Sequence, residues 1–310
     1  MSILYYCEDD TNGAILKALR ERLPTHNIEA WPECENPQAI TKAIVWQPPA
    51  DFFNNLSSLK QVLSIAAGVD HLLDHPGLPN DVSIIRLTDA GMAEPMADFV
   101  LYGTLHAQRR MTDIAIAQRN ASWQHELKPL GKSRLKVGIL GAGEMGRVAA
   151  HKLLSNGYSV ACWSRSPKPA SELTHYSGND GLDILLSTSN VLVCLLPLTP
   201  NTKHIINTTS LSKLPKNAFL INAGRGGHVD EQALLDMLNN GHLSGALLDV
   251  FESEPLPASS PFWGHEKVLV TPHVAAPTDI EGAIEQIAQS IELLDNKQTP
   301  PGTVDRTVGY

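Results

Sequence analysis

The feature that most constrains the fold of this 310-residue chain is a glycine-rich run, Gly141-Ala142-Gly143-Glu144-Met145-Gly146. It follows the apolar segment 136–140 and precedes a helical pattern over 147–154. In that context the first glycine permits a tight turn, the second lets a pyrophosphate approach the backbone, and the third allows close packing of helix on strand. The alternative is a glycine-rich turn that binds nothing. The position of the glycine-rich run between a strand and a helix favours a dinucleotide-binding loop.

Short apolar segments recur on both sides of this loop. They occupy 3–7, 28–31, 43–46, 62–67 and 82–87, and then 136–140, 160–163, 191–196, 219–222, 246–250 and 268–270. Helical or turn-rich sequence separates them, which is typical of parallel strands joined by crossover helices. We therefore expect an α/β protein with two Rossmann-like or flavodoxin-like domains, each a doubly wound parallel sheet.

Helical periodicity predicts how the strand series are connected. Apolar residues at helical spacing indicate one long helix from Met96 to about Asn120, followed by a polar loop over 123–134. A further helix is predicted over 280–294. The long helix is a candidate connection between the two domains.

The strand after the glycine loop indicates which nicotinamide dinucleotide is bound. A carboxylate at its end binds the ribose 2′-hydroxyl of NAD, whereas an arginine accommodates the 2′-phosphate of NADP. Here the strand 160–163 continues as Ser164-Arg165-Ser166-Pro167-Lys168, which contains no acid. The charges of Arg165 and Lys168 suit a phosphate group. NADP(H) is therefore favoured, with NAD(H) as one alternative and a solvated basic turn as the other.

Charge and cysteine content exclude several classes of function. With 33 acidic and 24 basic residues the formal net charge is −9, which argues against general affinity for nucleic acid or an anionic membrane. The four cysteines form no C-x-x-C pair, so neither a disulfide framework nor a structural zinc site is indicated. The longest apolar stretch, 191–196, is far short of the ~20 residues of a membrane span, and no signal-peptide pattern is present. We expect a cytoplasmic protein.

A histidine pair offers a rival reading as a metal site. His71 and His75 are four residues apart, with Asp70 and Asp74 beside them. No third group of ligands accompanies them, so we interpret them as solvated residues of a short helix that ends at Pro76-Gly77. No metal is predicted.

Three polar motifs follow late strands of the second series. They are Asn222-Ala-Gly-Arg225-Gly-Gly, Asp249-Val-Phe-Glu-Ser-Glu254-Pro and Thr271-Pro-His273. Taken singly, Arg225 reads as a surface arginine, Glu254 as a turn acid and His273 as one hydrogen-bonded histidine among twelve. Ligands of open α/β sheets bind at the carboxyl ends of strands. Three such motifs behind a dinucleotide loop therefore indicate a catalytic set.

Reduction of a 2-keto acid requires groups of these three types. Hydride transfer to the carbonyl carbon leaves an alkoxide that needs a proton, and His273 is able to supply it near neutral pH. A carboxylate such as Glu254 on the other ring nitrogen fixes the tautomer and favours the protonated imidazole. Arg225 is able to hold the substrate carboxylate as a planar fork and to polarise the keto oxygen.

At these residues the sequence resembles the D-isomer-specific 2-hydroxyacid dehydrogenases. The family's N-x-x-R-G-x-x-V-D-x-x-A-L, D-V-F-x-x-E-P and T-P-H segments occur here in order at 222–234, 249–255 and 271–273, after the dinucleotide loop. The resemblance covers nearly the whole chain. Within the family the chain is most similar to the glyoxylate/hydroxypyruvate reductase A group, through 45–49, 67–70, 86–92, 162–165 and 304–310. The resemblance implies an NADPH-dependent enzyme acting on small 2-keto acids, with glyoxylate and hydroxypyruvate as the leading substrates.

The same resemblance assigns further binding residues. The cofactor is expected along the glycine loop, the 164–166 segment and Leu196, Pro197, Ala223, Gly224 and Asp249, the last near the nicotinamide. For the substrate, backbone amides at Ala67 and Gly68 are implied to hold the carboxylate, with Met92 near the reacting groups. Trp46 is a candidate wall of the pocket, and simple core packing is the alternative for it.

The family fold also implies a chain that crosses between its lobes twice. Residues 1–97 and 278–310 then form the substrate (catalytic) domain, and 98–277 form the NADP-binding Rossmann domain, with a cleft between them. A homodimer is expected, with the helix after Met96 as a contact. Two other functions stay open: a dehydrogenase of a larger D-2-hydroxy acid, and a non-catalytic dinucleotide sensor on the same fold.

Overall fold

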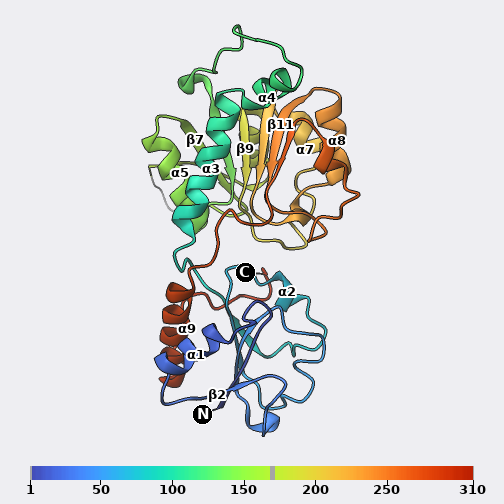
Figure 1. Cartoon of the computed structure of the whole chain (residues 1–310). Helices are drawn as coiled ribbons and strands as arrows, with labels where there is room; N and C mark the ends of the chain where they lie inside the picture. Colours follow the sequence, from blue (N-terminus) through green and yellow to red (C-terminus); the bar gives the residue numbers. More distant parts are fainter. Residues whose placement is uncertain (1, 168–171, 310) are drawn as a thin grey trace. The chain divides into compact units, whose positions relative to one another are not determined.

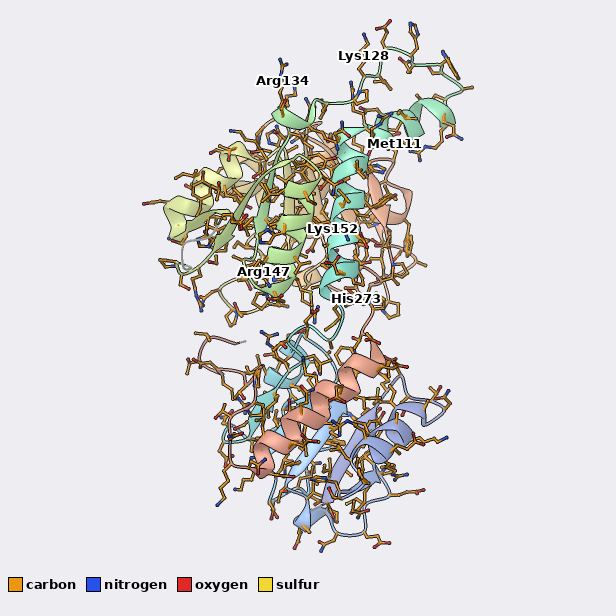
Figure 2. The ribbon with its side chains drawn as sticks, turned by 90° about the vertical axis from the view of Figure 1, so that its left-hand side faces the viewer. Met111, Lys128, Arg134, Arg147, Lys152 and His273 are labelled. Atoms are coloured by element: carbon orange, nitrogen blue, oxygen red, sulfur yellow. The ribbon has the colours of Figure 1, made fainter. Side chains whose placement is uncertain are left out.

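The computed structural model describes residues 2–167 and 172–309 and divides the chain into two compact units. The first unit contains Met1–Gly91 and Thr278–Tyr310, and the second contains Met92–Pro277. The second unit is therefore an insertion within the first. Its boundary precedes α3 (Ala93–Gln108), because that helix packs against α5 (Glu144–Ser155) of the same unit. Lys152 on α5 joins the two helices, 3.0 Å from the Glu94 carboxylate and 2.5 Å from that of Asp98 (Figure 2).

The first unit is built on a five-stranded parallel sheet with the strand order β2-β1-β3-β4-β5 (Figure 1). Its strands are β1 (Ser2–Cys7), β2 (Asn27–Ala30), β3 (Lys42–Trp46), β4 (Gln61–Ser64) and β5 (Ser83–Ile85). Its helices are α1 (Ala14–Arg22), α2 (Asp70–Leu73), α9 (Ile280–Asp295) and the 3-10 turn η1 (Pro37–Ala39). α1 packs against α9, and Arg22 forms a 2.7 Å ion pair with Glu285 across them. The C-terminal segment thus completes the unit that the N-terminal segment begins.

The second unit is built on a seven-stranded parallel sheet with the order β12-β11-β10-β9-β6-β7-β8. Its strands are β6 (Lys136–Leu140), β7 (Ser159–Ser164), β8 (Thr174–Ser177), β9 (Val191–Cys194), β10 (Ala218–Asn222), β11 (Leu243–Leu248) and β12 (Val268–Val270). Besides α3 and α5, its helical elements are α4 (Met111–Arg119), α6 (Gly178–Thr188), α7 (Thr208–Lys213), α8 (Glu231–Asn239), η2 (Lys132–Arg134), η3 (Gly226–His228) and η4 (Pro261–Gly264). The strand order reverses at β6 and β9, which makes this a doubly wound nucleotide-binding sheet. The prediction of two parallel-sheet α/β domains is confirmed.

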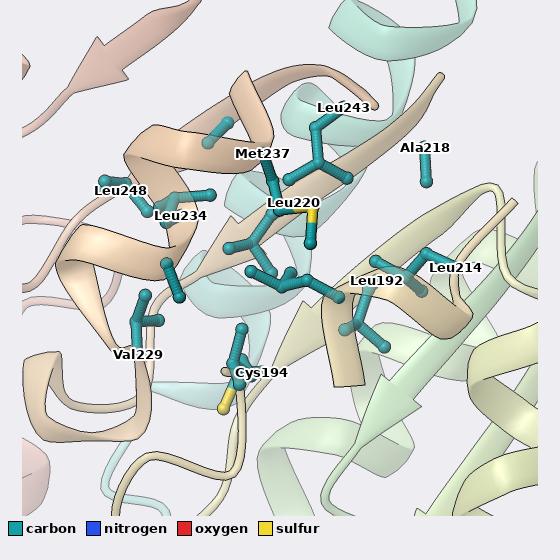
Figure 3. Packing of buried hydrophobic residues seen from close by; sticks show 14 of the residues in the cluster. Leu192, Cys194, Leu214, Ala218, Leu220, Val229, Leu234, Met237, Leu243 and Leu248 are labelled. Carbon is teal, nitrogen blue, oxygen red and sulfur yellow. The ribbon is translucent and has the colours of Figure 1, made fainter. Parts of the chain in front are cut away.

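Alternation along the central strands builds two cores in the second unit. In β9, Val191 and Val193 pack with α3 and α5 on one face, while Leu192 and Cys194 pack with α6, α7 and α8 on the other. Figure 3 shows the cluster on the face covered by α6, α7 and α8, which contains Leu192 and Leu220 from the sheet and Leu234 from α8. Burial on both faces explains why these strands read as nearly continuous apolar runs.

The prediction of one long helix from Met96 to about Asn120 is wrong, because two shorter helices occupy this segment. α3 ends at Gln108, and Arg110 adopts a left-handed conformation with φ +58° before α4 starts at Met111 (Figure 2). Gln108 is buried and exchanges two hydrogen bonds with Leu130, of 2.7 and 2.8 Å. The loop after α4 therefore returns to cover the end of α3, a long-range contact that helical periodicity does not report.

All four cysteines are free thiols, and burial raises the pKa of Cys162 to about 11 and that of Cys194 to about 12. Across 2–167 and 172–309, no helix has both the length and the apolar character needed to cross a membrane.

Candidate active site

The carboxyl ends of neighbouring strands in the second unit carry the residues predicted to bind the cofactor. The glycine loop follows β6, the 164–166 segment ends β7, Leu196 and Pro197 follow β9, Ala223 and Gly224 follow β10, and Asp249 follows β11. These five strands are consecutive in the sheet, in the order β11-β10-β9-β6-β7. Segments far apart in sequence are thus brought to one edge, at the position where dinucleotides bind in this class of sheet.

The glycine loop has the geometry that its sequence predicts. Gly141 has φ +114°, which disfavours a side chain, and a Cβ there would lie 2.7 Å from the Leu195 carbonyl oxygen. A Cβ on Gly146 would overlap the Gly141 carbonyl oxygen, so the helix packs directly on the strand. A Cβ on Gly143 would meet no atom within 4 Å. The loop therefore leaves open space beside the N-terminus of α5, where backbone N–H groups and the helix dipole favour a phosphate.

The segment predicted to select the cofactor lies beside that loop. Gly141 N–H donates to the Trp163 carbonyl over 2.9 Å, which places the end of β7 next to the turn. The Ser164 hydroxyl lies 2.7 Å from the Ser166 carbonyl and 2.8 Å from His175 Nε2, so it braces the segment. Arg165 is exposed. Lys168, the other predicted cation, lies outside the described residues.

Arg225 lies on the loop after β10, pressed against the segment that leads to Glu254. Its side chain is half-buried, and Nη1 donates to the Gly224 carbonyl over 2.9 Å. The next residue, Gly226, touches the backbone of Phe251, and a Cβ there would overlap the Phe251 carbonyl group. Only glycine allows this approach of the two loops, which brings the charge of Arg225 close enough to influence Glu254.

His273 and Glu254, which the motifs predict to act together, lie in direct contact. His273 Nδ1 lies 2.7 Å from Glu254 Oε2, and Glu254 Oε1 accepts the Phe251 N–H over 2.9 Å. Partial burial opposes ionisation of Glu254, but the hydrogen bonds from His273 and Phe251 and the charges of His273 and Arg225 hold its pKa below the ordinary value. Because the carboxylate is ionised at neutral pH, Nδ1 carries the proton that it donates to Glu254. The contact with Glu254 thus orients the half-exposed ring through one of its two nitrogens.

The buried side chain of Asp249 stabilises the loop that contains His273. It is 1% exposed, and its oxygens accept hydrogen bonds from the Thr271 hydroxyl at 2.6 Å and from Val274 N–H and Ala275 N–H at 2.9 Å each. His273 itself adopts φ +55°, a strained conformation for a non-glycine residue. The family resemblance implies only that Asp249 lies near the nicotinamide, and its contacts with the His273 loop become visible only in the structure.

The residues predicted to bind substrate are carried by both units. Ala67 and Gly68 follow β4 in the half-buried bend before α2. Trp46 ends β3, and its indole N–H donates to Asp9 over 3.0 Å, while its ring meets that of His71 edge-on at 4.8 Å. Met92 precedes α3 in the second unit and is 5% exposed.

The histidine pair of the first unit has structural partners. His75 Nε2 lies 3.2 Å from the Pro49 carbonyl, and its Nδ1 accepts the Gly77 N–H over 3.1 Å. The His71 ring packs on Trp46. Across the described part of the chain, no three His, Cys, Asp or Glu side chains gather in a way that could hold a metal ion.

Two polar residues of the site stand out only in the structure. Asn222 and His228 are both fully buried, and both contact the backbone of Arg225. Asn222 belongs to a recognisable motif, but sequence reasoning gave His228 no role. Their burial beneath a charged residue is the signal, and it requires the fold.

The reversed strand order, the glycine loop and the His–Glu pair at adjacent strand ends define a dinucleotide-dependent oxidoreductase. Comparison with known families identifies it further. The model of the D-isomer specific 2-hydroxyacid dehydrogenase NAD binding domain matches residues 101–275. The chain belongs to the D-isomer specific 2-hydroxyacid dehydrogenases, which confirms the resemblance seen in its motifs.

Relatives from three bacteria match over the full chain. A glyoxylate/hydroxypyruvate reductase A from Yersinia enterocolitica is 40% identical over 315 aligned positions, covering 100% of both chains. A D-isomer specific 2-hydroxyacid dehydrogenase from Xanthobacter autotrophicus, solved with NADPH and MES, has a TM-score of 0.93 at 36% identity, covering 100% of this chain and 99% of that one. An NADPH-dependent glyoxylate/hydroxypyruvate reductase from Sinorhizobium meliloti, solved with NADP and sulfate, has a TM-score of 0.91 at 34% identity with the same coverage.

Proposed function

We propose that this enzyme reduces small 2-keto acids with NADPH, converting glyoxylate to glycolate and hydroxypyruvate to D-glycerate. The observation that carries the proposal is the His273–Glu254 pair, 2.7 Å apart, with Arg225 on the adjoining loop. A protein that only senses a dinucleotide needs no oriented proton donor. The full-length similarity to reductases of these substrates supports the choice of keto acids.

The second unit binds the coenzyme in this proposal. The pyrophosphate binds at the N-terminus of α5, against Gly141, Gly143 and Gly146 and beside Glu144 and Met145. The path toward the nicotinamide is lined by Leu196, Pro197, Ala223 and Gly224. The bound coenzyme supplies the hydride. Ser164, Arg165 and Ser166 hold the ribose 2′-phosphate, since no carboxylate ends β7. Relatives of the same fold that were solved with NADPH and with NADP support this assignment, and NADH is the weaker alternative.

Three side chains then manage the charge that develops on the substrate. Arg225 binds the carboxylate as a fork and polarises the keto oxygen. His273 donates the proton from Nε2 as the oxygen becomes an alkoxide, while Nδ1–H stays bonded to the ionised Glu254. Backbone N–H groups of Ala67 and Gly68 hold the substrate carboxylate, and Met92 and Trp46 shape the volume around the reacting carbon.

Replacement of His273 tests the chemistry. Because a general acid contributes about 10²- to 10⁴-fold, His273→Ala is expected to lower kcat at least ~100-fold with the KM for NADPH changed less than about threefold. The matched control is His204→Ala, which breaks a similar half-exposed pair in the same unit, His204 with Glu252 at 2.5 Å, and is expected to keep normal kcat. An undiminished kcat in His273→Ala would contradict the assignment.

The wild-type enzyme tested with a panel of keto acids separates the alternatives. Oxidation of NADPH with glyoxylate and hydroxypyruvate supports the proposal, and a preference for larger or phosphorylated acids points to another D-2-hydroxyacid dehydrogenase. Binding of NADPH without turnover of any acid points to a sensor. In the same assay Arg165→Ala is expected to raise the KM for NADPH far more than that for NADH.

We further propose a homodimer that is assembled in the cytoplasm. Several large apolar side chains around α3, α4 and the following loop are exposed, namely Tyr102, Leu105, Met111, Ile114, Trp123 and Leu130. Trp123 is 91% exposed. Large apolar side chains left exposed along one stretch of chain favour association. Four free thiols suit a reducing compartment. Sedimentation analysis of the wild type and of Trp123→Glu tests the dimer, since the variant is expected to dissociate.

A further inference from the structure

The proposed mechanism leaves unexplained a buried histidine directly beneath Arg225. His228 ends the 3-10 turn η3 and is 0% exposed. Its Nδ1 lies 3.1 Å from the backbone nitrogen of Arg225, whose N–H points at it. A backbone N–H only donates, so Nδ1 carries no proton and the ring is the neutral tautomer with its proton on Nε2.

We propose that His228 is a positioning residue for the reaction, which fixes Arg225 by accepting its backbone N–H. The inference rests on the proposed role of Arg225 as the group that binds the substrate carboxylate. It also gives a function to a histidine that no motif explains. His228 does not touch substrate in this proposal, and it acts only through Arg225.

The contact is one of several hydrogen bonds that hold the backbone of Arg225. The His228 N–H donates back to the Arg225 carbonyl over 3.2 Å, and the Asn222 side-chain amide donates to the same carbonyl over 3.0 Å. Asn222 is also 0% exposed. Both polar groups of the Arg225 backbone are thus held by buried residues, while its Nη1 is held by the Gly224 carbonyl. The guanidinium is therefore presented from a fixed backbone in a fixed rotamer.

Tight packing makes the imidazole hard to replace by a water molecule. A Cβ on Gly224 would come within 3.2 Å of both Cε1 and Nδ1 of His228. On the far side the His228 carbonyl accepts the Ile206 N–H over 2.9 Å, which ties η3 to the neighbouring loop. Removal of the ring nitrogen would leave the Arg225 N–H without its acceptor in a space already filled by protein, which is unfavourable for a buried donor. The loop is expected to move to satisfy that donor.

Such a movement would affect the keto acid more than the coenzyme. A fork of two N–H groups binds a carboxylate only within a narrow range of angles, so a shift of about 1 Å weakens binding and carbonyl polarisation together. Ala223 and Gly224 precede Arg225 on the same loop, but the groups proposed to bind the pyrophosphate and the 2′-phosphate do not. The glycine loop after β6 and the segment ending β7 lie on other strands and keep their own contacts. A purely structural role of His228 would instead change the kinetic constants for both the keto acid and NADPH, or for neither.

Two variants of His228 separate positioning from packing. His228→Leu fills the space but removes the acceptor, and it is expected to lower kcat/KM for glyoxylate at least ~30-fold with the KM for NADPH within about threefold of wild type. His228→Asn places an amide oxygen two bonds from Cβ, as Nδ1 is, and is expected to recover kcat/KM to within about fivefold. The control His242→Leu removes a histidine of the same unit that contacts the Leu211 carbonyl at 3.1 Å, and it is expected to lower Tm without this kinetic change.

The outcomes that overturn the proposal are distinct from failure of the proposed function. Equal loss of kcat/KM in the Leu and Asn variants, or a parallel rise in the KM for NADPH, would remove the positioning role. Nitrogen-15 spectra of histidine-labelled enzyme give a readout without turnover, since His228 Nδ1 is expected to show the shift of an unprotonated acceptor. A protonated Nδ1 would overturn the inference. An enzyme inactive on all keto acids would remove the proposed function, while the same spectrum would still decide the contact to Arg225.

Discussion

Arg225 and His273 follow nearby strands of one sheet, yet the buried groups that hold them differ in charge. Beneath Arg225 lie two neutral side chains, Asn222 and His228, each making one hydrogen bond to its backbone. Beneath His273 lies one carboxylate, Asp249, which accepts three hydrogen bonds from the surrounding loop. The backbones differ as well, since Arg225 is extended at φ −144° and His273 is left-handed at φ +55°.

The proposed function accounts for this difference. A buried carboxylate under Arg225 would compete with the substrate carboxylate for the guanidinium, so neutral groups preserve its charge for the ligand. A left-handed residue at His273 requires several directed contacts to stay in place, and the two oxygens of Asp249 provide them. Neutral groups thus support the residue proposed to bind an anion, and a group with two acceptor oxygens supports the strained loop of His273.

The largest expected effect comes from removing the charged support. Asp249→Ala leaves two backbone N–H groups and the Thr271 hydroxyl without their acceptor, so we expect the free energy of unfolding to fall by about 3 kcal/mol. With the His273 loop released, kcat is expected to fall at least ~100-fold. Urea unfolding and steady-state kinetics measure the two effects.

Asp249→Asn is the control for this prediction. Its single carbonyl oxygen keeps part of the acceptor capacity without the charge, so both losses are expected to be smaller than in Asp249→Ala. If the two variants behave alike in kcat and in stability, the number of acceptors under His273 is not what holds the loop.

The next effect concerns the contact that brings the two loops together. Gly226→Ala would force a Cβ into the Phe251 backbone, and we expect about 2 kcal/mol of destabilisation together with a raised KM for the keto acid. Gly264→Ala is the matched control, since a Cβ there meets no atom within 4 Å. Equal thermal stability of the two variants would show that the Arg225 and Glu254 loops are not packed as tightly as the structure has them.

Local sequence predicted much of this arrangement because its signals are local. The turn at Gly141, the apolar strands 136–140 and 219–222, and the placement of Arg225 and His273 after strands each depend on a few adjacent residues. Parallel strands then bring their carboxyl ends to one edge whatever the details of packing. That rule is why motifs more than 40 residues apart could be assigned to one site.

The supports beneath the site could not be predicted in the same way. That His228 faces the Arg225 N–H depends on how η3 packs against the loop that contains Ile206. The break at Arg110 likewise depends on Leu130 returning to Gln108. Contacts of this kind depend on tertiary structure, and neither the spacing nor the type of the residues predicts them.

The smallest expected effect is electrostatic and tests whether Glu254 is ionised by its partners. Its pKa is lowered in the folded protein, so its contribution to stability is present above the ordinary value of 4.5 and is lost as pH falls through the lower folded value. The difference in free energy of unfolding between wild type and Glu254→Gln is therefore expected to shrink between about pH 5 and pH 3, measured by urea unfolding. Its size is under about 1 kcal/mol, because the side chain is 35% exposed and solvent screens the pair.

The His273→Ala background sharpens this last comparison. Burial opposes ionisation of Glu254, and the hydrogen bond from His273 is the strongest of the contacts that overcome it. Without that donor the Phe251 N–H and the Arg225 charge still act on Glu254, so the pH dependence of the Glu254→Gln difference is expected to become smaller without disappearing. An unchanged pH dependence would mean that the Arg225 side of the site governs Glu254. The carboxylate would then belong with the support of the arginine, and His273 would depend for its position on Asp249 alone.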